Sequence, residues 1–128
     1  MKKDAIVAVV GATTNREKWG YKVYKALKGY YSSVFPVNPK YKSIDLDRCY
    51  PDVSSLPERP DIVVTVVPPR ITEDVVKSCY KLGIKSVWMQ PGSESKEAID
   101  FCRKNNIDVV YNACLVVDGL KIGFDKDE

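Results

Sequence analysis

A loop of small and hydroxylated residues, Gly11-Ala12-Thr13-Thr14-Asn15, stands between an apolar run at residues 5–10 and a segment with helical spacing at residues 19–28. The run predicts a buried strand, and Gly11 permits a tight turn that residues with a Cβ resist. A strand, such a loop and a helix together present backbone N–H groups to a phosphate. The loop lacks both G-x-G-x-x-G and the end of a P-loop. It either contacts the phosphate of a nucleotide-type ligand or merely turns the chain.

Three cationic side chains could contact an anionic ligand. Lys40 follows the second apolar run. At this position, a nicotinamide-dinucleotide site carries an acidic residue that binds the ribose hydroxyls. A lysine at the same position suits a ribose phosphate instead. Arg70 follows Pro68 and Pro69, which stiffen their loop, and a guanidinium group suits bidentate phosphate binding. Lys22 lies near the start of the first predicted helix. Each of the three could equally be a solvated surface side chain.

Residues at one further loop, and aromatic residues beside the first loop, could also touch a ligand. Gln90 offers an amide, Gly92 permits close approach, and Ser93 supplies an N-cap hydroxyl for the helix predicted to follow. Capping alone explains Ser93, which leaves Gln90 and Gly92 as candidate ligand contacts. Trp19 and Tyr21 flank the first loop and could cover a bound group, although a core position is favoured for Trp19.

The most informative absence is histidine, of which the chain has none. This excludes Ser-His-Asp and Cys-His catalysis and imidazole metal sites within this sequence. Cys79 and Cys102 lie on the apolar stripes of predicted helices and are expected to be core thiols, since no C-x-x-C pair is present. Asp45, Asp47 and Asp52 lie in an irregular segment, where solvation explains them as well as acid–base chemistry would. No cluster has the spacing of a metal site.

Composition sets wider bounds. The chain has 128 residues, which suits one domain, and its hydrophobic (45%) and charged (29%) fractions are ordinary for a globular protein. Its net charge of +3 is spread along the sequence without a basic tract, which argues against nucleic acid and still suits an anionic small molecule. No signal peptide or membrane-spanning run is visible, so we expect a cytoplasmic protein without membrane contact.

The elements that must position these residues alternate along the chain. Strands are predicted at residues 5–10, 33–37, 61–67, 85–89 and 107–111, and helices at 19–28, 73–82 and 94–104, with at most a short helix at 53–56 in the irregular segment. Thr72 is the expected N-cap of the helix at 73–82. A hairpin is expected at residues 116–122. The pattern predicts a single α/β domain over residues 1–128, with a doubly wound, parallel, five-stranded, Rossmann-like sheet, helices on both faces, and a ligand site at the carboxyl ends of its strands.

An ordered set of motifs resembles a known family. The set comprises Gly-Ala-Thr-Thr at residues 11–14, Gly-Tyr-Lys-Val at 20–23, Pro-Val-Asn-Pro at 36–39, Val-Val-Pro-Pro at 66–69, Trp-Met-Gln-Pro-Gly at 88–92 and Asn-Ala-Cys at 112–114. Together they resemble the stand-alone CoA-binding proteins, which are similar to the N-terminal CoA-binding domain of the succinyl-CoA synthetase α subunit. The resemblance covers about residues 5–115.

The resemblance implies a Rossmann-like fold that binds coenzyme A, and it implies roles for particular residues. The loop of Gly11, Ala12, Thr13 and Thr14 would face the phosphates. The adenosine end would be lined by Val37, Asn38, Pro39 and Lys40, and the nucleotide held by Val67, Pro68 and Pro69. The pantetheine side would be lined by Gln90, Gly92, Asn112 and Cys114. Lys40 then suits the ribose 3′-phosphate, which agrees with its position.

The expected function is binding of coenzyme A or an acyl-CoA without catalysis by this chain, because the second domain and the phosphorylated histidine of the ligase subunit are both missing. A small NAD(P)-dependent oxidoreductase and a nucleotide-binding subunit of a larger enzyme complex stay open as alternatives. A homodimer or a partner subunit is also open. Cys114 could form a mixed disulfide with the CoA thiol or be an inert buried cysteine.

Overall fold

Five short apolar segments form a parallel sheet in the computed structural model, which describes residues 4–114. The elements in chain order are β1 (Ile6–Val10), α1 (Trp19–Lys28), β2 (Ser33–Val37), β3 (Ser43–Ile44), β4 (Asp47–Arg48), the short helix η1 (Val53–Ser55), β5 (Ile62–Thr65), α2 (Pro69–Leu82), β6 (Ser86–Met89), α3 (Lys96–Lys104) and β7 (Asp108–Val110). The hairpin predicted at residues 116–122 lies outside the described residues.

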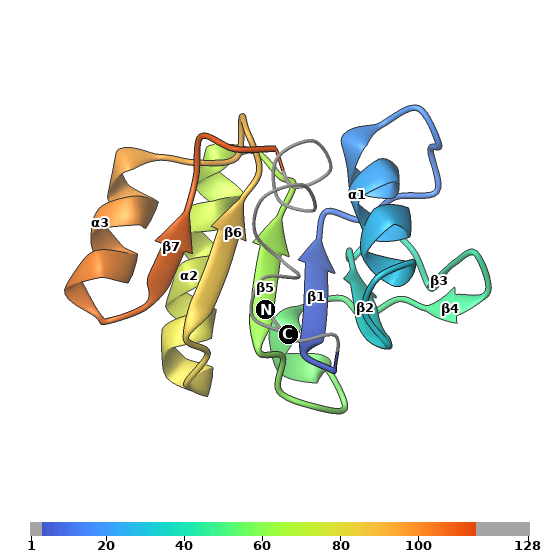
Figure 1. Ribbon diagram of the computed structural model, residues 1–128, viewed down its shortest axis with the longest axis horizontal. Helices are drawn as coiled ribbons and strands as arrows, with labels where there is room; N and C mark the ends of the chain where they lie inside the picture. The colour runs from blue at the N-terminus through green and yellow to red at the C-terminus, as the bar shows by residue number, and fades with distance from the viewer. Residues whose placement is uncertain (1–3, 115–128) are drawn as a thin grey trace.

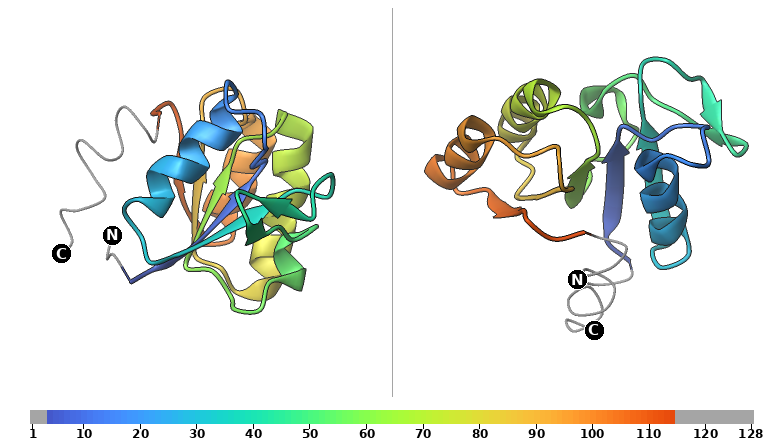
Figure 2. Two further views of the ribbon diagram at one scale, coloured as in Figure 1. Left: turned by 90° about the vertical axis from the view of Figure 1, so that its right-hand side faces the viewer. Right: turned by 90° about the horizontal axis from the view of Figure 1, so that it is seen from above.

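The sheet has the strand order β2-β1-β5-β6-β7, with every neighbouring pair parallel (Figure 1). The chain moves outward from β1 to β2 on one side, and from β5 through β6 to β7 on the other. The order therefore reverses between β1 and β5. Helix α1 covers one face of the sheet, and α2 and α3 cover the other (Figure 2). The doubly wound α/β fold predicted from the sequence is confirmed.

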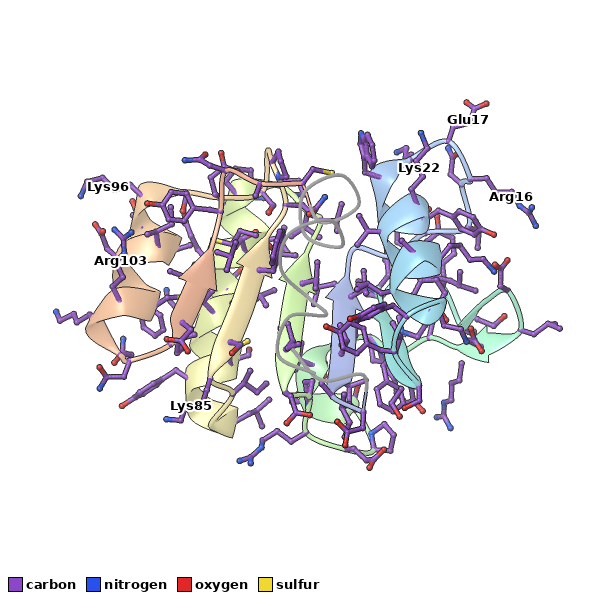
Figure 3. All side chains as sticks on the ribbon, in the orientation of Figure 1. Arg16, Glu17, Lys22, Lys85, Lys96 and Arg103 are labelled. Carbon is purple, nitrogen blue, oxygen red and sulfur yellow. The ribbon has the colours of Figure 1, made fainter. Side chains whose placement is uncertain are left out.

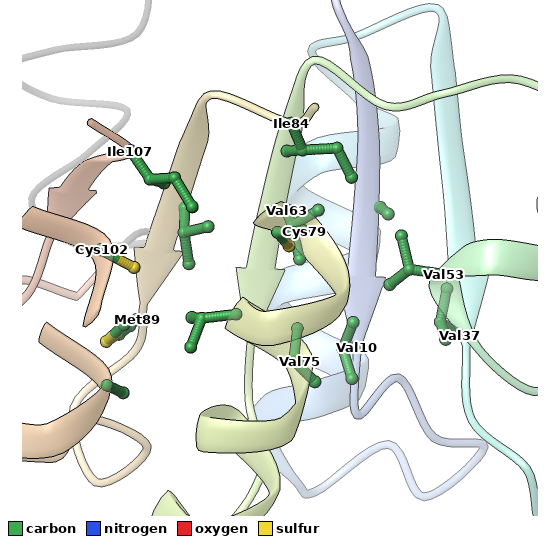
Figure 4. Packing of buried hydrophobic residues seen from close by; sticks show 14 of the residues in the cluster. Val10, Val37, Val53, Val63, Val75, Cys79, Ile84, Met89, Cys102 and Ile107 are labelled. Atoms are coloured by element: carbon green, nitrogen blue, oxygen red, sulfur yellow. The ribbon is translucent and has the colours of Figure 1, made fainter. Parts of the chain in front are cut away.

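Alternate residues of each strand fill two cores. Val7 and Val9 of β1 pack with Tyr24 and Leu27 on the α1 face, while Ala8 packs on the opposite face. This is the pattern expected of a strand buried on both sides, and it explains why β1 is apolar without alternation. Figure 4 shows the cluster on the α2 and α3 face.

Cys79 and Cys102 lie in the cluster on the α2 and α3 face, as predicted. Burial raises the pKa of the Cys79 thiol to about 12 and that of the Cys102 thiol to about 11. Because the thiolate is the reactive form, both cysteines act as small core residues.

Two helix starts differ from the sequence prediction. Helix α2 begins at Pro69, with Pro68 at the N-cap, so Thr72 is a buried residue inside the helix and not its cap. Proline is well suited to the first helical turn because its missing N–H is not needed there. The N-cap of α3 is Ser95, whose hydroxyl accepts from Ala98 N at 3.0 Å, and not Ser93.

Ser93 has a different role. Its buried hydroxyl lies 2.7 Å from Gln90 O and 3.0 Å from Thr65 O, so it joins the loop after β6 to the end of β5. Strand β5 itself ends two residues earlier than predicted.

The irregular segment contains a small antiparallel hairpin, β3–β4, that the sequence did not predict. Its turn residues Asp45 and Leu46 both have positive φ angles. Tyr21 of α1 donates to Asp45 at 2.7 Å, and Tyr24 donates to Asp47. The hairpin is therefore held against α1 by its carboxylates. Within residues 4–114, no helix has both the length and the apolar composition needed to span a membrane.

Candidate functional site

A cavity of about 1040 Å³ lies at the carboxyl ends of β1, β2 and β5, where the strand order reverses. In parallel α/β sheets this is the expected place for a ligand, and the volume lies at the upper end of the ~300–1,000 Å³ range of small-molecule sites. The lining residues are Val10, Gly11, Thr13, Glu17, Lys18, Trp19, Gly20, Val37, Asn38, Pro39, Lys40, Tyr41, Pro51, Asp52, Val53, Val66, Val67, Pro68, Ile71, Asp74, Val75 and Ser78. We call this cavity the edge pocket.

Two glycines shape the loop after β1. Gly11 has a φ of +102°, and a Cβ placed on it would lie 2.1 Å from Val66 O. A Cβ on Gly20, in the first turn of α1, would lie 2.2 Å from Gly11 O. The backbones of β1, α1 and the segment after β5 can therefore approach one another only because both residues lack a side chain. This is a closely packed turn of the kind that brings backbone N–H groups to a phosphate.

Side-chain hydrogen bonds join the loop after β1 to the loop after β2. Asn38 Nδ2 donates to Ala12 O at 2.9 Å, and the hydroxyls of Thr13 and Tyr41 are hydrogen-bonded at 3.0 Å. The bond with Thr13 lowers the pKa of the Tyr41 hydroxyl from its usual value. These contacts fix the two walls of the edge pocket relative to each other.

Two helices begin at the edge pocket. The N-caps of α1 and α2 are Lys18 and Pro68, and neither makes a side-chain capping hydrogen bond in the described structure. Neither helix has an acidic residue in its first turn. The N-terminal N–H groups and the positive dipole ends of both helices thus lie at the pocket without a capping side chain or a first-turn acidic residue, which favours an anion there.

The edge pocket brings together eight of the predicted site residues, and nine lie outside its lining. Those in the lining are Gly11, Thr13, Val37, Asn38, Pro39, Lys40, Val67 and Pro68. Those outside it are Ala12, Thr14, Lys22, Pro69, Arg70, Gln90, Gly92, Asn112 and Cys114.

The residues outside the lining differ in their surroundings. Ala12 is fully buried behind the loop, and Thr14 is exposed on it. Lys22 extends from the start of α1 (Figure 3), with its Nζ 4.8 Å from the centre of the Trp19 ring. Trp19 is half exposed, so its expected core position was wrong. Arg70 is exposed in the first turn of α2.

Gln90 and Cys114 meet at the same edge of the sheet, beyond β6 and β7. Trp88 Nε1 donates to Gln90 Oε1 at 3.0 Å, and Gln90 Nε2 lies 3.5 Å from Cys114 Sγ. Gln90 is buried, and Cys114 is half-buried. Gly92 and Asn112, both exposed, complete the predicted set on these two loops. Of these four residues, Gln90 and Cys114 are in contact, and all four lie outside the lining of the edge pocket.

Several lining residues were not singled out from the sequence as ligand contacts. Ile71, Asp74, Val75 and Ser78 line the edge pocket from α2, and Tyr41 and Val53 line it from the segment after β2. The four α2 residues recur at i, i+3, i+4 and i+7, the spacing of one helix face. That spacing is present in the sequence, but the helix predicted at residues 73–82 left out Ile71.

The acidic residues of the irregular segment have structural partners. Asp45 and Asp47 bind tyrosines of α1, and Asp52 Oδ1 accepts from Ser54 Oγ and caps η1 through Ser55 N. The bond from Ser54 lowers the pKa of Asp52. In the part of the chain that is described, no three His, Cys, Asp or Glu side chains gather as metal ligands.

Comparison with known proteins agrees with this geometry. The family model for the CoA binding domain matches residues 5–119. ADP-forming acetate–CoA ligase I of Archaeoglobus fulgidus is 28% identical over 120 residues, covering 86% of this chain and 18% of the ligase. The α subunit of ADP-forming acetate–CoA ligase II of Pyrococcus furiosus is 27% identical over 120 residues, covering 85% of this chain and 26% of the subunit. The chain thus spans about a quarter or less of these two relatives.

Solved structures show the same relationship. A conserved hypothetical protein from Pyrococcus furiosus has a TM-score of 0.81 at 38% identity, and the match covers 88% of this chain and 97% of that one. The apo form of the dinucleotide-forming acetyl-coenzyme A synthetase 1 of Ca. Korarchaeum cryptofilum has a TM-score of 0.72 at 28% identity, with 82% and 25% covered. The chain belongs to the CoA-binding domain family, and its homologues include a region of the succinyl-CoA synthetase-like, ADP-forming acetate–CoA ligases.

Proposed function

We propose that this chain binds coenzyme A, or an acyl-CoA, in the edge pocket and carries out no catalysis of its own. The observation that carries the proposal is the start of α1. There, an uncapped helix N-terminus and the glycine turn at Gly11 face a cavity at the point where the strand order reverses. This arrangement suits a diphosphate, which needs backbone N–H donors and a positive dipole end.

The remaining parts of coenzyme A find suitable surroundings along the same sheet edge. Val37 and Pro39 offer apolar surface for the adenosine end, and Lys40 beside them suits the ribose 3′-phosphate. Lys18 also lines the pocket, and Arg70 is exposed in the first turn of α2, which begins at the pocket. The pantetheine arm would run toward Gln90 and Cys114, beyond β6 and β7.

Binding without catalysis is supported by the residues that the chain has and lacks. The sequence contains no histidine. The carboxylates of Asp45, Asp47 and Asp52 make structural hydrogen bonds. No acidic residue occupies the end of β2, where a dinucleotide site would need one, so the oxidoreductase alternative has no support from this site.

A second candidate function is that of a CoA-binding subunit within a larger enzyme complex. It is favoured by the match of this chain to about a quarter of a ligase α subunit. The CoA site would be the same in both cases. Gel filtration of the chain mixed with purified candidate partner subunits would distinguish the two functions, because only a subunit of a complex would co-elute with a partner.

Thermal unfolding of the ligand-free protein tests the binding proposal. Coenzyme A, acetyl-CoA, 3′-dephospho-CoA, NAD and NADP are added in turn. A ligand at about one hundred times its Kd adds roughly 2.7 kcal/mol, which raises the Tm by several degrees. We expect a shift with coenzyme A that is smaller with 3′-dephospho-CoA. A shift with NAD or NADP alone, or no shift with any of the five, would contradict the proposal.

A further inference from the structure

One arm of the edge pocket is a slot between η1 and α2. Val53 of η1 and Val75 of α2 are 5% and 9% exposed and belong, with Val10 and Val37, to one buried cluster (Figure 4). Pro51 lines the η1 side, and Ile71 lines the α2 side. The walls of the slot are thus aliphatic, which suits a flat heteroaromatic ring better than a phosphate or a flexible chain.

Helix α2 contributes two polar side chains to this slot. Asp74 and Ser78 are one helical turn apart and both line the pocket. The Asp74 carboxylate is exposed, and within residues 4–114 neither side chain has a hydrogen bond or an ion pair to another group. Asp52, on the η1 side, is different, because its carboxylate already caps η1. The slot therefore offers one uncommitted acceptor and, at Ser78, one uncommitted hydroxyl.

A carboxylate here conflicts with a purely phosphate-binding pocket, since it repels a polyanion. Its presence calls for a ligand group that donates hydrogen bonds. The adenine ring presents an N6 amino donor next to the N7 acceptor, whereas guanine and hypoxanthine present an O6 acceptor in place of the amino group. Among these three purines, only adenine has an edge that matches an acceptor at Asp74 and a donor at Ser78.

We propose that Asp74 and Ser78 select adenine in this slot, with the Asp74 carboxylate accepting from the N6 amino group and the Ser78 hydroxyl donating to N7. This inference rests on the proposed binding of coenzyme A and adds the identity of the base to it. With hypoxanthine, the O6 atom would face the Asp74 carboxylate and no donor would lie between them. Adenine is then selected both by its hydrogen bonds to Asp74 and Ser78 and by the repulsion between Asp74 and the O6 atom of a competing base.

The test compares coenzyme A with its deaminated counterpart, in which hypoxanthine replaces adenine, by titration calorimetry on the full chain. The wild type is expected to bind coenzyme A at least about tenfold more tightly than the deaminated form, as one hydrogen bond to a charged group allows. Asp74→Ala should weaken coenzyme A binding and bring the ratio of the two Kd values close to one. Ser78→Ala should weaken both ligands alike, because both carry N7.

Glu73→Ala is the matched control, since it removes the same charge from the neighbouring position, which is not in the lining. It should leave the ratio unchanged. A wild type that binds both ligands equally, or an Asp74→Ala variant that retains the wild-type ratio, would overturn the inference. If the wild type binds neither ligand, the proposed function itself has failed. The Tm without ligand verifies that each variant is folded.

Discussion

Asn38 and Ala12, which are 26 positions apart, are joined by a hydrogen bond of 2.9 Å from Asn38 Nδ2 to Ala12 O. The Oδ1 atom of the same side chain accepts from Lys40 N at 2.9 Å. One amide therefore shapes the loop that carries Lys40 and ties it to the loop after β1. The resemblance implies ligand contact by Asn38, and the structure assigns its side chain a positioning role as well.

Replacing Asn38 by alanine should lower both stability and affinity. Loss of two hydrogen bonds should reduce the free energy of unfolding by about 1–2 kcal/mol, as measured by urea denaturation. Affinity for coenzyme A should fall because the two loops are then ordered only on binding. The control is Asn15→Ala, since Asn15 Oδ1 makes only a local bond to Glu17 N. Equal stability and affinity in the two variants would contradict the positioning role.

Lys40 should distinguish ligands that differ by the ribose 3′-phosphate. Lys40→Gln should weaken binding of coenzyme A by about tenfold and leave 3′-dephospho-CoA unaffected, because only the former carries that charge. Lys42→Gln is the control, as Lys42 is exposed two residues away and outside the lining. Calorimetric Kd values for both ligands provide the measurement. A similar loss with both ligands would place the 3′-phosphate elsewhere.

The sequence predicted the sheet well because its strands are short, apolar and separated by clear helical patterns. The bounds of α1 and β2 agree residue for residue with the prediction. The start of α2 was wrong because Pro68 and Pro69 were interpreted as a stop, although Pro69 fits the first helical turn. Parallel topology then placed the loop residues Gly11, Lys40 and Pro68 at one edge.

The features that the sequence did not predict depend on contacts between residues that are distant in the sequence. The β3–β4 hairpin is held by bonds from Tyr21 and Tyr24, more than twenty residues away in sequence. Trp19 is the first residue of α1 and is half exposed, so helical spacing alone wrongly predicted a core position for it. The pocket face of α2 was missed because the predicted helix began at residue 73 and left out Ile71. Only the position of η1 shows that this face borders a cavity.

Alanine substitutions of Gly11 and Gly92 test whether the turn after β1 needs the close backbone approach at Gly11. Both have positive φ angles, +102° and +95°, but a Cβ on Gly11 would meet Val66 O at 2.1 Å, whereas one on Gly92 would meet nothing within 4 Å. Gly92→Ala should therefore cost only the backbone strain, about 1–2 kcal/mol. Gly11→Ala should cost about 3 kcal/mol or more, because backbone atoms must move as well. Urea denaturation measures both, and equal losses would show that the close approach to Val66 is not needed.

Asp47 should make the stability of the hairpin depend on pH. Partial burial raises the pKa of this carboxyl, but hydrogen bonds from Lys28 and Tyr24 outweigh burial and hold the pKa below its usual value of 3.8. A carboxyl with a depressed pKa in the folded state stabilises the protein above the unfolded pKa. That contribution is lost as the pH falls from about 4 through the folded pKa.

Asp47→Asn should therefore destabilise the protein at pH 7 and have a smaller effect at pH 2.5, as followed by urea denaturation at both values. Asp100→Asn serves as the control, because Asp100 pairs with Lys96 at 2.8 Å on an exposed helix face, where an ion pair contributes little. If Asp47→Asn is as mild as Asp100→Asn at pH 7, the hairpin does not depend on its carboxylate. Its attachment to α1 would then rest on the apolar contacts of Ile44, which is buried against Tyr24 and the rest of the α1 core.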